Sequence, residues 1–259
     1  MQIDLHNHTY LCNHATGKME EYVKQAIANK TKFFGFSDHA PMNFDPRYRM
    51  TKEQTKIYED EIERLKELYK SQITILKGYE VDFLPNFMDE DILKKDVDYL
   101  IGSVHFLNGW GFDNPEFISK YAEVDINEIW IAYFETIQEM ANSKLFDIVG
   151  HIDLIKVFKF LPTINMKKHY KKTLEAIKEA DMTIELNPAG LRKKIEEQYP
   201  SKEILEMAFS MSIPITIGSD AHKPEDVGFK LDFLQKLAYQ AGYREIAIFK
   251  ERERMLIKI

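Results

Sequence analysis

Residues Gln2–His8 read QIDLHNH, a short run rich in apolar residues that ends in two histidines. Runs of this composition are typical of β-strands, and we expect a strand from Gln2 to His6. Residues two positions apart in an extended strand point to the same side, so His6 and His8 can both reach one ion. A third histidine, His14, follows shortly after them. Because histidine is the commonest metal ligand, this cluster indicates a metal site.

Similar runs recur along the chain and alternate with longer segments of helical period. We expect six further strands, at Phe33–Ser37, Ile73–Glu80, Tyr99–His105, Phe146–His151, Met182–Asn187 and Ile213–Ser219. Between them, apolar residues recur three and four positions apart, as at Tyr58, Ile62 and Leu65, which predicts amphipathic helices. Strands that alternate with helices predict a parallel sheet, and no Gly/Pro/Ser-rich linker interrupts the chain. The sequence therefore predicts an α/β fold, a seven-stranded (β/α)7 TIM-like barrel in which residues 1–259 form a single domain.

Local signals place two helix starts and one unusual loop. Thr51 to Gln54 reads as a capping box, and Pro224 stands where a first helical turn is expected to begin. The connection from Phe106 to Tyr121, FLNGWGFDNPEFISKY, is long, aromatic and punctuated by Gly, Asn and Pro rather than helical. Loops of this length are usually functional; an aromatic flap with only a structural role is the alternative.

The composition argues against several classes of protein. The 259 residues carry a formal net charge of −7, which argues against nucleic-acid binding as the main function. The sequence contains neither a signal-peptide core nor the roughly 18 consecutive apolar residues of a membrane span, so we expect a cytoplasmic protein without membrane contact. Cys12 is the single cysteine, which excludes an intrachain disulfide and a cysteine-based zinc site. We expect Cys12 to serve in packing, and the oligomeric state is left open.

Ligand-type side chains lie at or just beyond the C-terminal ends of six of the seven expected strands. In strand order they are His6 and His8, Asp38 and His39, Glu80, His105, His151, and Asp220 and His222. The remaining strand ends in Asn187. Because the C-terminal ends of barrel strands surround one site, these residues are expected to be neighbours. At any one of these positions, the alternative is an isolated histidine that makes ordinary hydrogen bonds and binds no metal. We expect His169, which lies within a helical segment, to be solvated.

The potential ligands are too many for one catalytic ion. They are His6, His8, His14, His39, Glu80, His105, His151, Asp220 and His222. Imidazole and carboxylate ligands suit zinc, iron or manganese, and two or three such ions are expected. Ions of this kind polarise phosphoryl oxygens and supply a nucleophile at neutral pH, which favours a metal-dependent hydrolase.

Several motifs together resemble those of the polymerase and histidinol phosphatase (PHP) family. They are DLHNHT (4–9), FSDHA (36–40), GYEVDF (78–83), GSVHFLNGWGFDNPEF (102–117), GHIDLIK (150–156), ELNPAGLRK (185–193) and IGSDAH (217–222). The resemblance extends from residue 4 to about residue 228. It implies a distorted seven-stranded β/α barrel that carries a trinuclear metal site.

The resemblance also implies roles for the individual ligands. One ion would be held by His6, His8, Glu80 and Asp220, with Glu80 bridging to a second ion held by His105 and His151. The third ion would take His14, His39 and His222. Asp38 is expected either to orient a ligand histidine or to cap a helix.

Phosphate and substrate contacts are implied for three further residues. Lys156 and Arg192 would bind the phosphate and act in catalysis beside Glu80 and Asp220, unless their charges are simply solvated. Asp113, in the aromatic connection, would contact the substrate or instead cap a turn.

Within the PHP family the chain is most similar to the stand-alone histidinol-phosphate phosphatases. This implies hydrolysis of L-histidinol phosphate to L-histidinol and phosphate in histidine biosynthesis. A PHP phosphoesterase of broader specificity, acting on nucleotides or other small phosphate esters, is the alternative. A metal-dependent amidohydrolase is disfavoured, because two-metal deacylation does not need a third set of ligands. A non-catalytic PHP binding module is disfavoured by the complete ligand set and the acidic charge.

Overall fold

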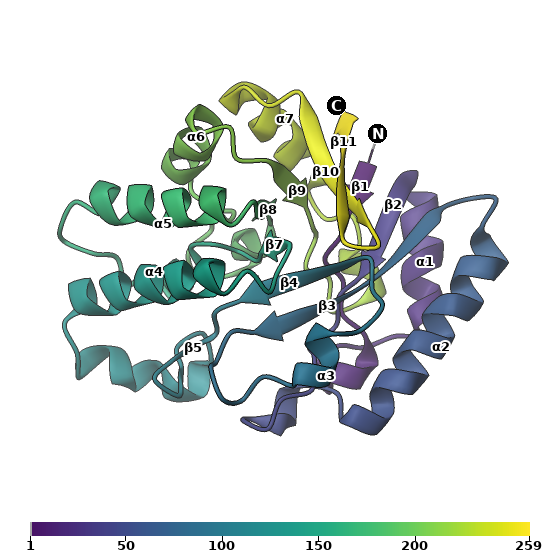
Figure 1. The fold of residues 1–259 in the computed structure, drawn as a ribbon, viewed down its shortest axis with the longest axis horizontal. Helices are drawn as coiled ribbons and strands as arrows, with labels where there is room; N and C mark the ends of the chain where they lie inside the picture. Colours follow the sequence, from purple (N-terminus) through teal and green to yellow (C-terminus); the bar gives the residue numbers. More distant parts are fainter. Residues whose placement is uncertain (1) are drawn as a thin grey trace.

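The computed structural model describes residues 2–259, and Figure 1 shows strands at the centre with helices around them. Seven strands form one sheet in the order β1-β2-β3-β4-β7-β8-β9, and all neighbouring pairs are parallel. The strands are β1 (Gln2–Asp4), β2 (Thr31–Phe36), β3 (Thr74–Asp82), β4 (Tyr99–Ser103), β7 (Ile148–Val149), β8 (Thr183–Leu186) and β9 (Ile215–Ile217). The predicted parallel α/β architecture is confirmed.

The two outer strands of this sheet, β1 and β9, meet along a seam. Leu5 N donates a hydrogen bond to Ile217 O at 2.9 Å. The buried carboxylate of Asp4 crosses the same seam and accepts from Ser219 N at 2.8 Å and from Ser219 Oγ at 2.7 Å. The sheet therefore curls into a nearly closed, distorted barrel, as the sequence predicts.

Helices connect successive strands and cover the outside of the barrel. They are α1 (Met19–Ala28), α2 (Lys52–Tyr69), α3 (Glu90–Leu93), α4 (Ile126–Ser143), α5 (Lys167–Glu179), α6 (Lys202–Ser210) and α7 (Leu231–Ala241). The predicted capping box starts α2: Gln54 N donates to Thr51 Oγ1 at 3.3 Å, and Thr51 N donates to Gln54 Oε1 at 2.7 Å. None of the helices within residues 2–259 is long and apolar enough to cross a membrane.

Pro224 begins a helical turn, as predicted, but this turn, Pro224–Asp226, is a separate 3-10 helix that precedes α7. The ψ of Val227, 126°, is not helical and Gly228 has a φ of +78°, so the helical turn ends here. Gly228 N instead donates to Asp4 Oδ2 at 3.1 Å and strengthens the β1–β9 seam.

The long connection after β4 is more ordered than its sequence indicates. It contains a small hairpin, β5 (Phe106–Leu107) and β6 (Trp110–Gly111), followed by a 3-10 helix, η3 (Pro115–Ala122). The side chain of Asn114 starts this helix by accepting from Glu116 N at 2.9 Å. The expectation that the segment is not helical is therefore wrong for η3.

The C-terminal hairpin is an element that the strand pattern did not reveal. It consists of β10 (Glu245–Lys250) and β11 (Glu253–Lys258), which pair antiparallel and lie beside β9 and the N-terminal β1 in Figure 1. Thr216 Oγ1, on β9, donates to Ala247 O at 2.9 Å. Arg252, at the hairpin turn, donates from Nε to Asp147 Oδ2 at 2.8 Å, just before β7. The hairpin therefore closes the N-terminal end of the barrel and leaves the opposite end for the site.

Candidate metal centre

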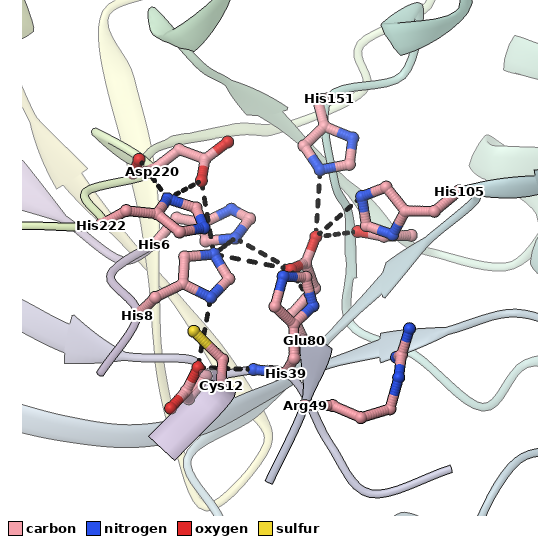
Figure 2. A network of polar contacts seen from close by, with 12 residues as sticks. His6, His8, Cys12, His39, Arg49, Glu80, His105, His151, Asp220 and His222 are labelled. Atoms are coloured by element: carbon pink, nitrogen blue, oxygen red, sulfur yellow. Dashed lines mark hydrogen bonds and ion pairs between the residues drawn. The ribbon is translucent and has the colours of Figure 1, made fainter. Parts of the chain in front are cut away.

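The two histidines that follow β1 lie side by side at the C-terminal end of the barrel (Figure 2). His6 and His8 are buried, and their Nε2 atoms are 3.2 Å apart. His8 Nε2 is also 3.3 Å from Oδ1 of Asp220, which follows β9. The two-residue spacing thus places both rings toward one point, as predicted.

Glu80, near the end of β3, lies at the centre of the cluster (Figure 2). Its Oε1 is 3.0 Å from His151 Nε2 and 3.7 Å from His105 Nε2. Its Oε2 is 3.0 Å from His39 Nδ1. Burial opposes ionisation of Glu80, but the surrounding histidines outweigh burial and hold its pKa well below the usual value. The two oxygens of this carboxylate therefore face different ligand groups, as a bridging ligand requires.

A third group of imidazoles lies beside His8. Ligand atoms of His8, His39 and His222 all lie within 4.8 Å of one another. The rings of His8 and His222 stack with centroids 4.0 Å apart. His14 stands at the outer side of this group, with its Nε2 3.0 Å from His222 Nε2. His8 therefore belongs to both the first and the third group, a sharing that the family pattern did not imply.

The tautomers of His14 and His222 show that this site suits a cation. Their Nδ1 atoms face the carbonyl oxygens of Cys12 and Asp220, at 2.9 Å and 3.2 Å, so each Nδ1 carries a proton. Burial is the main cause of a lowered pKa for both rings, so both are neutral near pH 7. Two lone pairs consequently face each other across 3.0 Å. Two nitrogens bound to one tetrahedral zinc lie about 3.4 Å apart, so the observed approach fits a shared divalent ion.

Two buried carboxylates that the sequence did not single out hold ligand histidines from behind. Glu185 Oε1 is 2.6 Å from His6 Nδ1, and Asp82 Oδ1 is 2.6 Å from His105 Nδ1. Arg49 Nη1 donates in turn to the other oxygen of Asp82. Such partners fix the tautomer and direction of a ligating ring. Asp82 follows Glu80 by two positions on the same strand, so the two side chains lie on the same side of the strand. This spacing could have identified Asp82 from the sequence.

Asp38 and Cys12 lie behind His8. Asp38 Oδ1 is 3.3 Å from His8 Nδ1 and accepts from His39 N at 2.9 Å. Asp38 thus orients a ligand histidine, and it caps none of the helices within residues 2–259. Cys12 is fully buried and its Sγ donates to Thr9 O at 3.1 Å, which agrees with a role in packing.

All of the ligand candidates except His6 line a pocket of about 460 Å³. Its wall also includes Tyr48, Arg49, Asp113, Phe117, Lys193 and Tyr199. Of these residues, only Asp113 was predicted from the sequence. Burial raises the pKa of Asp113, whereas the nearby His105 lowers it. His169 lies in α5, partly exposed, as expected for a solvated helix residue.

The structure directs Lys156 away from the pocket, contrary to its predicted role. The side chain is buried, and its Nζ donates to Glu197 Oε2 at 2.7 Å and to Gln198 O at 2.8 Å. Asp153 Oδ2 is 2.9 Å from the same nitrogen. Because the three protons of the ammonium group have these three partners, Lys156 holds the segment after β8 in place rather than a ligand.

Arg192 lies directly behind a metal-ligand candidate. Its Nη2 donates to Ser219 O at 3.1 Å and to Asp220 O at 2.9 Å. Its Nη1 is buried and finds no hydrogen-bond partner within residues 2–259. The guanidinium also packs 4.7 Å from the ring centre of Phe229. Arg192 is therefore held behind Asp220, and it is not among the residues that line the pocket.

Residues 4–189 match the PHP domain family. The chain belongs to this family. A relative from Deinococcus radiodurans, described as a probable histidinol-phosphatase, is 36% identical over 96% of this chain and 97% of its own length. The histidinol-phosphatase of Bacillus subtilis is 30% identical over 90% of this chain and 98% of its own length. The fold matches the crystal structure of histidinol phosphate phosphatase from Lactococcus lactis, complexed with zinc, L-histidinol and phosphate, with a TM-score of 0.85 over 98% of each chain at 21% identity.

Proposed function

We propose that this chain is a metal-dependent phosphatase that hydrolyses L-histidinol phosphate to L-histidinol and phosphate. The observation that carries the proposal is the convergence of imidazoles and carboxylates around Glu80 at the floor of the pocket. The Deinococcus radiodurans and Bacillus subtilis relatives, which match over nearly their whole lengths, support the choice of substrate.

The ligand set fits three divalent ions of zinc, iron or manganese. Glu80 would join a site of His6, His8 and Asp220 to a site of His105 and His151, and His14, His39 and His222 would hold the third ion. When bound, such ions polarise phosphoryl oxygens and activate water at neutral pH. The zinc found with the Lactococcus lactis enzyme supports this choice of metals.

Side chains outside the ligand set suit the two ends of this substrate. Arg192, with an unpaired Nη1 beside Asp220, would neutralise phosphoryl oxygens as charge moves onto them. Asp113, on the pocket wall, would pair with the protonated amine of the substrate. Tyr48 and Phe117, also on the wall, offer ring faces against which an imidazole can pack.

The test is phosphate release from L-histidinol phosphate, compared with a panel of nucleotides and sugar phosphates, on protein whose metal content is measured by elemental analysis. We expect histidinol phosphate to be hydrolysed at least tenfold faster than the other esters. Comparable rates with all esters would refute the specific substrate but leave a phosphatase. His8→Ala should lose both metal and activity, whereas His169→Ala, a matched change on α5, should lose neither. Full activity in His8→Ala would refute the metal-dependent proposal.

A further inference from the structure

Asn187 directly follows β8, the strand of the barrel that supplies none of the proposed metal ligands. This strand lies between β7 and β9, and the chain beyond those two strands carries His151 and Asp220. Asn187 is fully buried and is not among the residues that line the pocket. Any role of Asn187 in the reaction must therefore act through its neighbours.

The side-chain amide of Asn187 connects two carboxylates. Its Nδ2 donates to Asp220 Oδ2 at 3.1 Å and to Glu185 Oε2 at 3.1 Å. Its Oδ1 accepts from Ala189 N at 2.8 Å, and this bond fixes which end of the amide carries the two protons. Both protons of Nδ2 therefore go to carboxylate oxygens.

The bond from Asn187 decides which oxygen of Asp220 faces the metal centre. Asp220 Oδ1 is 3.3 Å from His8 Nε2 and 3.5 Å from His222 Nδ1, whereas Oδ2 accepts from the amide. The main chain of Asp220 is fixed as well, since its N donates to His6 O at 2.8 Å. Because the main chain and one carboxylate oxygen are both held, Oδ1 points toward the ligand cluster in one direction.

The second carboxylate, Glu185, carries the effect of the amide to two other ligand candidates. Its Oε1 is 2.6 Å from His6 Nδ1, and its Oε2 accepts from His151 N at 2.8 Å. A Cβ at position 218 would lie 2.6 Å from Glu185 Oε1, so the glycine there leaves room for the carboxylate beside His6. The amide is therefore bonded to one ligand candidate directly and to the support of two others.

We propose that Asn187 is a positioning residue of the metal centre, whose amide holds Asp220 with Oδ1 toward the ions and braces Glu185 behind His6. Groups that orient metal ligands in this way typically contribute about 10–100-fold to metal affinity. This inference rests on the proposed metal-dependent function and adds a residue that prepares the site without touching the substrate.

Titration of metal-free protein with zinc, in competition with a chromophoric chelator, tests the inference without any substrate. Asn187→Leu keeps a similar shape but donates no hydrogen bond, so its zinc affinity should fall at least tenfold. Should Asn187→Leu fail to fold, Asn187→Ser carries the same expectation, because the serine hydroxyl can still accept from Ala189 N but is too short to replace the amide at Asp220. A zinc affinity within about threefold of wild type in the folded variant would overturn the inference.

Lys156→Met is the matched control for the chain segment after β8. Lys156 Nζ donates to Gln198 O at 2.8 Å, and Asn187 N donates to Tyr199 O at 2.7 Å, so both residues hold this segment. The control loosens the segment but leaves the amide bonds to the two carboxylates intact. It should lower the Tm of metal-free protein and leave zinc affinity within about threefold of wild type. Equal losses of zinc affinity in Lys156→Met and Asn187→Leu would overturn the inference, because the segment would then be the cause.

Kinetics with L-histidinol phosphate give a second measurement. Because Asn187 does not line the pocket, the activity of Asn187→Leu at limiting zinc should be at least tenfold below wild type and should rise as zinc is added, with KM for the ester unchanged. A raised KM with normal zinc affinity would contradict a positioning role. Wild-type protein that holds metal but does not hydrolyse the ester would overturn the proposed function, and the zinc titrations would still decide the role of Asn187.

Discussion

Replacement of Arg49 by methionine tests how strongly a buried ion pair stabilises the wall of the metal site. Arg49 is 5% exposed and its partner Asp82 is 3% exposed. Burial raises the pKa of Asp82, but Arg49 and His105 outweigh burial and lower it from 3.8 to about 2. At about 1.4 kcal/mol per unit, this shift corresponds to roughly 2 kcal/mol, shared between Arg49 and His105. Since breaking a buried pair typically costs about 3–5 kcal/mol, we expect Arg49→Met to destabilise the fold by roughly 2–4 kcal/mol.

Thermal unfolding of metal-free protein, followed by circular dichroism, measures this effect. A domain of this size loses about 2–4 °C in Tm per kcal/mol, so the Tm at pH 7 should fall by roughly 5–15 °C. Arg47→Met is the matched control on the same loop. Arg47 pairs with Glu116 at 3.3 Å, but the two side chains are 65% and 52% exposed. The control should therefore change stability by less than about 1 kcal/mol.

The pH dependence of the Arg49→Met effect gives a second check. Because the pKa of Asp82 is lower in the folded than in the unfolded protein, its stabilisation is fully present above about pH 5 and is lost as the pH falls toward 2. The Tm difference between wild type and Arg49→Met should consequently narrow between pH 5 and pH 3. A Tm difference near zero at pH 7, or one that stays constant down to pH 3, would refute the reasoning.

Three further changes test other parts of the structure. His8→Ala should release more metal than His14→Ala by elemental analysis, because His8 belongs to two ligand groups; equal losses would contradict this sharing. Lys156→Met should lower the Tm without raising KM for the phosphate ester, since the ammonium is bound to protein groups; a raised KM at unchanged Tm would restore its predicted phosphate contact. Phe249→Ala, in the hairpin that closes the barrel, should cost about 3–5 kcal/mol in urea unfolding, because the ring is 2% exposed. Met255→Ala, at a residue of the same hairpin that is 42% exposed, should lower the free energy of unfolding by less than about 1 kcal/mol. Similar losses of stability in both variants would show that Phe249 does not contribute to the core as its burial indicates.

Part of the fold was predictable because it depends on local patterns. The alternation of strand and helix periods identified the parallel sheet, and the Thr51 capping box placed the start of α2. The C-terminal hairpin was not predictable in the same way. Gly228, just beyond the turn that Pro224 begins, bonds to Asp4 across the barrel seam, and the nearby sequence does not reveal this contact. The strands of the hairpin follow α7 without a motif that distinguishes them from another α/β unit.

The sequence by itself determined which side chains meet at the centre of this protein. His6 and His8 converge because residues two apart share a side of an extended chain, and Glu80 joins them because barrel strands end around one site. Both rules need only spacing and strand position.

Tertiary structure alone decided which groups support these ligands and which charges remain available. Glu185 reaches His6 across 179 positions, and Lys156 is diverted from the pocket by Glu197 and Asp153. Such pairings depend on the register of neighbouring strands and on the course of the loops that follow them. A buried charge pairs with an opposite charge that lies close to it in the closed barrel. The free-energy cost of leaving such a charge unpaired is larger than the contribution of local sequence preferences.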